Sequence, residues 1–308
     1  MKRIYITRPL MPIAHEMLSH YFHVEQNRED RALLKSELIQ VMQTFDGVLS
    51  TLIDPFDEEV LSYAETLKVI SNCASGLDNI DQEMALKKGI KVFNVPHATT
   101  DSTADLTLAI LLALIRKVPK ARDYVKEGLW KGWDPSLFLG EELKGKTWGI
   151  LGYGDIGKAV AKRALGFGLK VIAHSRKGFI SSHENILSVS LEELYQTSDY
   201  LSLHVPLTEE TSGMIHQGAF LQMKKRPVLI NMARGKVVVT KDLLEALSRG
   251  WIRAAALDVT DPEPIDSTHL LCHHDNVLIL PHIGSATTEC RSQMARQAAE
   301  NLVSYFYD

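Results

Sequence analysis

Short apolar runs, many of them continuous in Val, Ile and Leu, recur along the chain and alternate with stretches of helical spacing. Continuous runs of this kind are typical of strands buried on both faces, and strands that alternate with helices form parallel sheets. The predicted strands are residues 3–7, 21–26, 47–50, 67–72, 90–95, 147–152, 170–175, 200–205, 227–233, 254–259 and 276–281. The pattern therefore predicts an α/β fold built on doubly wound parallel sheets.

Helical spacing separates most of these runs. The predicted helices are residues 12–20, 31–43, 155–168, 191–198 and 241–250. Gly250 is placed to end the last of them. A single long helix is expected over residues 104–128, whose apolar first part suits a connector between domains. The glycines, the proline and Trp130 and Trp133 make residues 128–146 a predicted loop, suited to an arm over a partner subunit.

Size and charge exclude several classes of protein. At 308 residues the chain is about twice the usual domain length, so two domains are expected. A formal net charge of −4, without a basic block, argues against nucleic acid as a partner. The most apolar stretch, residues 106–115, is about half as long as a bilayer crossing requires. We therefore expect no membrane span.

Cysteine and histidine spacing gives no sign of a disulfide framework or a metal centre. The cysteines are odd in number and widely separated, at Cys73, Cys272 and Cys290. His273 and His274 are adjacent, but no third candidate ligand accompanies them. We therefore expect a cytoplasmic protein without a bound metal.

The sequence GYGDIG follows a predicted strand and opens a predicted helix. In this setting Gly152 permits a tight turn, Gly154 lets the backbone approach a phosphate, and Gly157 lets the helix pack close to the strand. The N–H groups at the start of such a helix bind phosphate. We predict a dinucleotide site here, with Asp155 and Ile156 in the same turn. The alternative is a turn that serves packing only.

The next predicted strand ends in His174, Ser175, Arg176 and Lys177, and no carboxylate follows before Glu184. A carboxylate at this point would bind the ribose 2′-hydroxyl of NAD and repel the 2′-phosphate of NADP. A hydroxyl, a guanidinium and an ammonium group instead bind phosphate. The residues favour NADP(H), with NAD(H) possible. The alternative is a solvated basic turn without a ligand.

Four residues suited to chemistry follow predicted strands late in the chain: Arg234, Asp258, Glu263 and His282. The carboxyl ends of parallel strands meet at one edge of a sheet, so these side chains are expected to converge. Taken singly, three of them have a structural alternative. Arg234 would then be a surface cation, Glu263 a loop acid and His282 a core histidine.

Together with the glycine motif, these residues resemble the D-isomer-specific 2-hydroxyacid dehydrogenases over nearly the whole chain. The matching segments, in the order of the family, are ASGLDNID (74–81), TTDSTADLTLAILLALIR (99–116), GILGYGDIGKAVAKRALGFG (149–168), HVPLT (204–208), INMARGKVV (230–238), ALDVTDPEP (256–264) and PHIGSAT (281–287). Several independent motifs in one order make a chance match implausible.

The resemblance implies roles for the three central residues. Arg234 matches the arginine that grips the substrate carboxylate and polarises the keto oxygen. His282 matches the acid that protonates the alkoxide as hydride arrives, and Glu263 matches its partner. A carboxylate beside a histidine stabilises the imidazolium form, which has a proton to donate.

Other assignments follow from the resemblance alone. Ser75 and Gly76 match positions that offer backbone N–H groups to the substrate carboxylate, and Leu52 matches a substrate-facing loop. Thr103 and Asp258 match positions at the nicotinamide end of the cofactor, where Asp258 would accept from the carboxamide. The remaining positions that match cofactor contacts are Val205, Pro206, Ala233, His282 and Gly284.

The family architecture implies two Rossmann-like domains with a cleft between them. Residues 1–99 and 283–308 would form an outer substrate-binding domain, and residues 100–282 the dinucleotide-binding domain. Helices at the crossings would act as hinges that close the cleft before hydride transfer. Family members form homodimers, which implies contact through the cofactor domains and the loop around Trp130 and Trp133. The family usually continues past the final helix into a returning segment, whereas this sequence stops at Asp308. Either the tail is shorter here or the sequence is truncated, so the last element of the outer domain stays open.

Within the family, the WKGWDPSLFLG stretch, the SRK strand ending and the INMARGKVV motif look most like glyoxylate and hydroxypyruvate reductases. We therefore expect NADPH-dependent reduction of one of these small 2-keto acids to the D-2-hydroxy acid. One alternative is a dehydrogenase for another 2-keto acid, such as D-lactate or phosphoglycerate dehydrogenase. Another is a non-catalytic NAD(H)-sensing protein, although a sensor has no need of the Arg234, Glu263 and His282 set.

Overall fold

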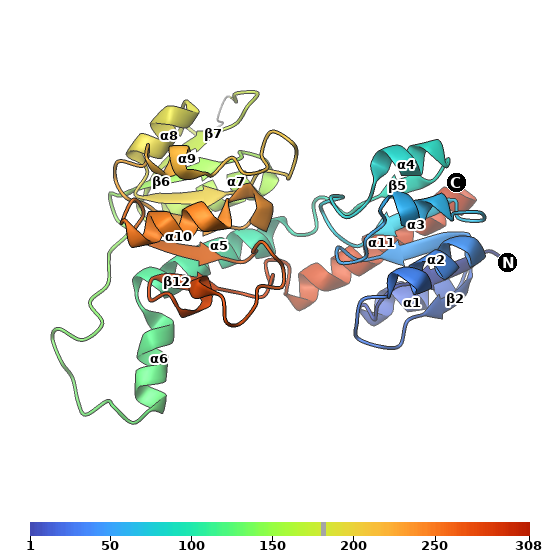
Figure 1. Ribbon diagram of the computed structural model, residues 1–308, viewed down its shortest axis with the longest axis horizontal. Coiled ribbons are helices and arrows are strands. Elements are labelled where there is room, and N and C mark those ends of the chain that lie inside the picture. The colour runs from blue at the N-terminus through green and yellow to red at the C-terminus, as the bar shows by residue number, and fades with distance from the viewer. Residues whose placement is uncertain (180–182) are drawn as a thin grey trace. The chain divides into compact units, whose positions relative to one another are not determined.

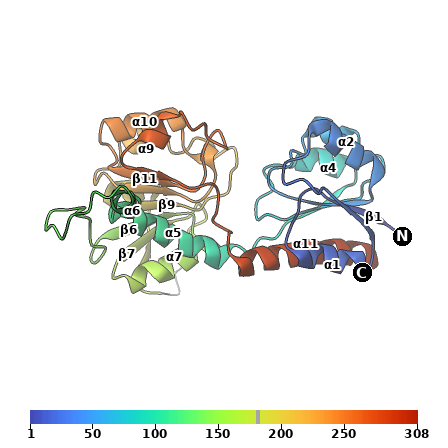
Figure 2. The ribbon, with the colours of Figure 1, turned by 90° about the horizontal axis from the view of Figure 1, so that it is seen from below.

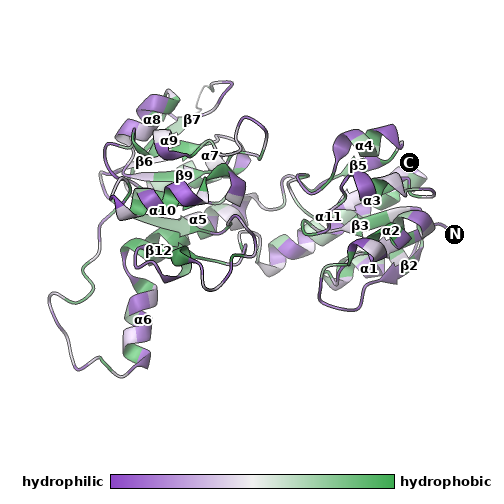
Figure 3. Ribbon diagram, in the orientation of Figure 1, coloured by the Kyte–Doolittle hydropathy of each residue, from purple (hydrophilic) through white to green (hydrophobic). Residues whose placement is uncertain are grey.

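The computed structural model describes residues 1–179 and 183–308, and it confirms the predicted α/β class. The chain divides into two compact units, Met1–Thr99 with Ser285–Asp308, and Thr100–Gly284. Each unit is built on a parallel sheet with helices on both faces (Figure 1). The central strands β3, β4, β9 and β10 are buried along their whole length, and the hydropathy colouring shows hydrophobic residues in the strands of both sheets (Figure 3).

The first unit has a five-stranded sheet in the order β2-β1-β3-β4-β5. Its strands are β1 (Arg3–Ile6), β2 (His23–Gln26), β3 (Gly47–Ser50), β4 (Val69–Asn72) and β5 (Lys91–Phe93). Its helices are α1 (Pro12–Ser19), α2 (Lys35–Thr44), α3 (Glu58–Ser62), α4 (Gln82–Lys87) and α11 (Thr288–Tyr307). Helices α1 and α11 cover one face, and α2 and α4 cover the other (Figure 2).

Helix α11 joins the end of the chain to the first unit. Ser71 in β4 donates a hydrogen bond to the carbonyl oxygen of Ala298 at 2.8 Å. The hydroxyl of Tyr307 donates to the carbonyl oxygen of Tyr21 at 2.9 Å. Both ends of the chain therefore contribute to the same core.

The second unit has a seven-stranded sheet in the order β12-β11-β10-β9-β6-β7-β8. Its strands are β6 (Thr147–Leu151), β7 (Lys170–His174), β8 (Ile186–Ser188), β9 (Tyr200–Leu203), β10 (Val228–Asn231), β11 (Ala254–Leu257) and β12 (Val277–Ile279). The strand order reverses between β6 and β9. In a doubly wound sheet, ligands bind in the crevice outside the carboxyl ends of the strands at such a switch point.

The helices of the second unit form two layers. They are α5 (Thr100–Ile115), α6 (Val118–Lys126), α7 (Asp155–Gly166), α8 (Leu191–Thr197), α9 (Gln217–Phe220) and α10 (Thr240–Ser248), with 3₁₀ turns η1 (Gly235–Val237) and η2 (Leu270–His273). Helices α5 and α7 pack on one face, and α9 and α10 pack on the other (Figure 2). Within the described residues, no helix combines the length and the apolar character that crossing a membrane requires.

Two details of the second unit differ from the sequence prediction. The single helix expected over residues 104–128 is wrong: the chain breaks between α5 and α6, where Lys117 adopts a left-handed φ of 56°. Pro119 follows in the first turn of α6, where its missing N–H group costs no helical bond. Strand β8 was not predicted. By contrast, Gly250 has a φ of +67° after α10, as expected for a glycine that ends a helix.

Candidate active site

Most of the predicted cofactor and catalytic residues follow strands of the second sheet. Because these strands are parallel, their carboxyl ends lie at one edge. The segments at this edge are 152–157 after β6, 175–177 after β7, 205–206 after β9, 233–234 after β10, 258–263 after β11 and 282–284 after β12. The six strands are neighbours in the sheet, so residues from distant parts of the chain share one region.

The three glycines of the motif meet different surroundings. Gly152 has a φ of +97°, and a Cβ there would lie 2.7 Å from the carbonyl group of His204. A Cβ at Gly157 would lie 2.1 Å from the carbonyl oxygen of Gly152. Among the described residues, no heavy atom lies within 4 Å of a Cβ built at Gly154, which begins α7 without a side-chain cap. Gly152 and Gly157 serve packing, whereas Gly154 leaves space at a helix N-terminus that suits a phosphate.

The turn after β7 is closed by a hydrogen bond from Gly178 N–H to the carbonyl oxygen of Ser175, at 2.8 Å. Arg176 forms a close ion pair with Glu210, and both side chains are exposed. Sequence reasoning missed Glu210, which comes from the segment after β9. The two glutamates that follow HVPLT were the available signal, but their distance from Arg176 in the sequence concealed the pairing.

The loop that carries Arg234 is fixed by its neighbours. The side chain of Asn231 accepts from the N–H of Ala233 at 3.0 Å and donates to the carbonyl oxygen of Arg234 at 2.9 Å. A Cβ at Gly235 would lie 1.8 Å from the carbonyl oxygen of Thr260. Glycine at this position therefore lets the loops after β10 and β11 touch.

Glu263 and His282 form a short hydrogen bond, in which His282 Nδ1 and Glu263 Oε1 are 2.6 Å apart. His282 adopts a left-handed φ of 54°. Its backbone N–H donates to the carbonyl oxygen of Asp258 at 2.9 Å, which stabilises this conformation. Burial acts to raise the pKa of Glu263, but the hydrogen bond and charge of His282, with help from Arg234, hold this pKa below its usual value. The glutamate is therefore ionised at neutral pH beside the imidazole.

Asp258 holds the backbone next to His282. Its Oδ1 accepts from the N–H of Ile283 at 2.8 Å, and its Oδ2 accepts from the N–H of Gly284 at 2.7 Å. Ser102 and Thr103 of α5 donate to the carbonyl oxygen of Gly284 at 2.7 and 3.3 Å. Burial raises the pKa of Asp258, although the two backbone donors oppose it. Each carboxylate oxygen of Asp258 keeps a lone pair that could accept from a carboxamide. The predicted contact with the cofactor stays a prediction.

The predicted substrate residues Leu52, Ser75 and Gly76 belong to the first unit, in the loops after β3 and β4. The hydroxyl of Ser75 lies 3.0 Å from that of Thr99 and also donates to backbone carbonyls. The side chain of Asn94 donates to the carbonyl oxygen of Ser75 at 2.6 Å. Ser75 therefore has its hydroxyl engaged in the fold, which leaves its N–H as the group to offer a ligand.

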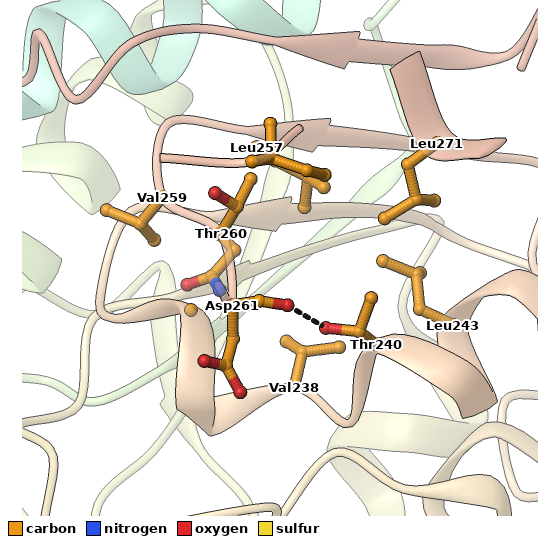
Figure 4. Close-up of a pocket in the computed structure, with 11 residues that line it drawn as sticks. Val238, Thr240, Leu243, Leu257, Val259, Thr260, Asp261 and Leu271 are labelled. Atoms are coloured by element: carbon orange, nitrogen blue, oxygen red, sulfur yellow. Dashed lines mark hydrogen bonds between the residues drawn. The ribbon is translucent and has the colours of Figure 1, made fainter. Parts of the chain in front are cut away.

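A small cavity lies behind the loop that carries Glu263, with room for about one water molecule. Figure 4 shows Thr240 at the start of α10, with its hydroxyl directed to the carbonyl oxygen of Asp261, at 2.8 Å. The residues around it are largely apolar, among them Val238, Leu243, Leu257, Val259 and Leu271. The cavity thus belongs to the support of the loop.

The segment after α6 extends away from the sheet of the second unit (Figure 1). It carries Trp130 and Trp133, which are 59% and 86% exposed. Its far end is anchored, because Phe138 packs edge-on against Tyr124 and a Cβ at Gly140 would lie 2.6 Å from the backbone at the end of α5. The loop expected here is confirmed, and it presents two large apolar side chains to solvent.

The fold and the arrangement at the sheet edge agree with comparisons to known proteins. The family model "D-isomer specific 2-hydroxyacid dehydrogenase, NAD binding domain" matches residues 108–284. The chain belongs to the D-isomer-specific 2-hydroxyacid dehydrogenase family, and the resemblance inferred from the sequence is confirmed.

Particular relatives are similar over nearly the full length. The glyoxylate reductase of Thermococcus litoralis is 43% identical over 309 residues, which cover 98% of this chain and 93% of that protein. The glyoxylate reductase of Aeropyrum pernix is 42% identical, with 98% and 92% covered. The crystal structure of the TT0316 protein from Thermus thermophilus matches with a TM-score of 0.92 at 42% identity, covering 99% of this chain and 96% of that one.

Proposed function

We propose that this protein reduces glyoxylate or hydroxypyruvate to the corresponding D-2-hydroxy acid. The observation that carries the proposal is the 2.6 Å hydrogen bond between His282 and Glu263, at the same sheet edge as Arg234. An acid held by a carboxylate, beside a guanidinium, is the set that reduction of a 2-keto acid requires. Relatives named glyoxylate reductase, such as that of Thermococcus litoralis at 43% identity, support the substrate.

In this proposal each side chain has one task. Arg234 binds the substrate carboxylate and polarises the keto oxygen. Glu263, ionised because its pKa is held low, stabilises the imidazolium of His282 and fixes its Nδ1. Nε2 of His282 then gives its proton to the oxygen of the substrate. A nicotinamide cofactor, when bound, supplies the hydride.

The remaining roles divide between the two units. The first unit binds the substrate, through Leu52 and the N–H groups of Ser75 and Gly76. The second unit binds the cofactor, with Thr103 and Asp258 at the nicotinamide end. Gly154 provides the space for the pyrophosphate, and its open surroundings support this assignment.

We also propose that NADPH is preferred to NADH. Ser175, Arg176 and Lys177 follow β7 and would surround a 2′-phosphate. Arg176 is paired with Glu210, so binding of NADPH would exchange one anion for another at this guanidinium. Glu210 would therefore compete with the 2′-phosphate for Arg176 and weaken the preference for NADPH.

A homodimer in the cytoplasm completes the proposal. The exposed Trp130 and Trp133, on an arm anchored by Phe138, support contact with a second copy of the chain. In such a dimer a tryptophan from the partner would help to shape the small substrate pocket. The odd number and wide spacing of the cysteines in the sequence support a reducing compartment.

Initial rates over a panel of keto acids test the substrate. We expect kcat/KM to be higher for glyoxylate and hydroxypyruvate than for pyruvate and phosphohydroxypyruvate, with each reduced cofactor. The reverse order would replace the proposed substrate by another 2-keto acid. Tight cofactor binding without turnover of any of the four would favour a sensing protein.

The cofactor preference has its own test. Arg176→Ala should raise KM for NADPH far more than KM for NADH, because only NADPH has a 2′-phosphate to lose. Glu210→Gln should lower KM for NADPH and leave KM for NADH unchanged. Equal changes with both cofactors would contradict the assignment of these residues.

A further inference from the structure

We propose that Asn79, acting with Asn72, is a positioning residue that ties the two substrate loops of the first unit into one rigid surface. We call this pair the asparagine bridge. The proposal rests on the proposed function, since it takes Leu52 and the N–H groups of Ser75 and Gly76 as substrate contacts. Its consequence is that the bridge sets the size of the 2-keto acid that the site accepts.

Asn79 holds the loop after β3. Its Nδ2 donates to the carbonyl oxygens of Thr51 and Asp54, at 3.2 and 2.9 Å, on either side of Leu52. The carbonyl oxygen of Asn79 accepts from the N–H of Phe56 at 2.9 Å. One residue from the second loop therefore fixes the backbone before and after Leu52.

Asn72 holds the loop after β4 and connects it to Asn79. Its Nδ2 donates to the carbonyl oxygen of Gly76 and to Oδ1 of Asn79, both at 3.0 Å. Its Oδ1 accepts from the hydroxyl of Ser50 at 3.1 Å. Ser50 and Asn72 are the last residues of β3 and β4 and are fully buried. The bridge therefore starts from the sheet itself and reaches both loops.

An amide is the side chain that suits this position. It donates and accepts at the same time, which a carboxylate or an ammonium group cannot do. It also adds no charge beside a ligand that carries a carboxylate. Asn72 is buried, Asn79 is half-buried, and both side-chain amides are hydrogen-bonded; losing one member of such a network loosens the other. Here that network fixes the separation between Leu52 and the N–H groups of Ser75 and Gly76.

Asp54 adds a second brace within the first of these loops. Its Oδ2 accepts from the hydroxyl of Thr7 at 2.6 Å and from the N–H of Thr51 at 2.7 Å. The bond from Thr51 closes the turn around Leu52, and the bond from Thr7 ties that turn to the end of β1. The side-chain link to the second loop is made by Asn79, beside a backbone bridge between Phe56 and Ile80 that Asn79→Ala leaves in place. Asn79→Ala therefore removes the side-chain coupling of the two loops alone.

The test is Asn79→Ala compared with Asn27→Ala. Asn27 makes the same type of bond in the same unit, since its Nδ2 donates to the carbonyl oxygens of Thr7 and Arg31 at 3.1 and 3.2 Å. We expect Asn79→Ala to raise KM for glyoxylate about tenfold, as loss of two hydrogen bonds predicts. KM for NADPH should not change, and the preference for glyoxylate over pyruvate should fall. Asn27→Ala should lower the unfolding temperature by a similar amount and leave KM for glyoxylate unchanged.

A rise in KM for glyoxylate that is no larger in Asn79→Ala than in Asn27→Ala would overturn the proposal. Equal losses in kcat and in both KM values, in step with the unfolding temperature, would also overturn it, because a merely structural role has that signature.

Hydrogen exchange provides a readout that needs no turnover. In Asn79→Ala, amides of residues 51–56 and 73–78 should exchange faster together, whereas Asn27→Ala should affect neither segment. Asn79→Asp keeps an acceptor for Asn72 and loses the donors to the first loop, so it should release residues 51–56 more than residues 73–78. Faster exchange confined to the neighbours of residue 79 would contradict the bridge. If the wild type reduces no keto acid, the proposed function fails while exchange still decides whether the loops are coupled.

Discussion

The loops that carry the proposed substrate residues of the first unit and the carboxyl edge of the second sheet present different kinds of polar group. In the first unit, the loops after β3 and β4 are held by amides and hydroxyls, such as those of Ser50, Asn72 and Asn79. In the second unit, the corresponding edge carries Arg234, Glu263, His282 and Asp258. Asp54, in the first of these loops, is buried in its own turn, and Asp57 at the end of that loop caps α3. We infer that recognition relies on fixed neutral dipoles, whereas the chemical step relies on groups that hold charge and protons.

Removing the proposed acid, His282, from the carboxyl edge of the second sheet should have the largest effect on the rate of reduction. His282→Ala should lower kcat about a hundredfold or more, because it removes a general acid. Steady-state rates with glyoxylate and NADPH measure the loss, and an unchanged unfolding temperature serves as the control for folding. A near-normal kcat would show that the proton comes from elsewhere and that the two edges do not divide the work as stated.

Adding a methyl group at Gly235 of the second unit should destabilise the fold more than adding one at Gly47 of the first unit, because the first meets backbone atoms and the second meets side chains. Gly235→Ala drives a methyl group into the carbonyl of Thr260, which belongs to a loop backbone, so we expect about 3 kcal/mol of destabilisation. In Gly47→Ala the new methyl meets the flexible end of Ile4 at 2.7 Å, and we expect about 1 kcal/mol. Calorimetry compares the two variants. Similar losses would mean that the loops after β10 and β11 can separate without cost.

The pH dependence of stability should also come from the second unit. His204 keeps some exposed surface, but its Nδ1 is buried and finds no hydrogen-bond partner among the described residues. Burial lowers the pKa of His204 to about 3. In the unfolded chain this histidine takes up a proton near pH 6.5, whereas in the folded chain it does not. Stability should therefore fall as pH drops from 6.5 toward 3, by up to about 1.4 kcal/mol per pH unit.

Tryptophan fluorescence follows this effect, since all four tryptophans lie in the second unit. Urea midpoints measured between pH 4 and pH 7 should lose most of their slope in His204→Gln. His23→Gln, an exposed substitution in the first unit, is the matched control and should retain the slope. An unchanged slope in His204→Gln would assign the acid sensitivity to other groups.

The smallest effect should come from a substitution in the loops after β3 and β4 of the first unit, which are held by neutral polar groups. Ser75→Ala removes a hydroxyl that contacts Thr99 and two backbone carbonyls but leaves the N–H in place. We expect KM for glyoxylate to rise about threefold, with kcat unchanged, as loss of one neutral hydrogen bond predicts. A fall in kcat comparable to that of His282→Ala would show that the hydroxyl takes part in the chemical step.

Most strands could be predicted because they carry continuous apolar runs, as β4, β6 and β10 do. Strand β8 escaped because it is a short edge strand in which only Ile186 is buried. The helix predicted over residues 104–128 has a helical pattern throughout, and only the left-handed Lys117 breaks it. Conformation at one residue is decided by packing around it, which a sequence pattern does not record.

The candidate site could be predicted only in part. Arg234, Glu263 and His282 were identified because they lie in short motifs after strands. The pairing of Arg176 with Glu210 and the asparagine bridge depend on which loops meet in space. Asn72 and Asn79 differ little from other polar loop residues until the fold brings their amides to 3.0 Å.

The hydrogen bonds from Ser102 and Thr103 to Gly284 join the place where the chain enters the second unit to the place where it leaves. A segment whose two ends are adjacent can be inserted into a surface loop of a host protein without stretching that host. Residues 100–284 thus have the geometry of a portable module. The same closure predicts that a circular permutant with joined ends at these positions would retain the fold of this unit.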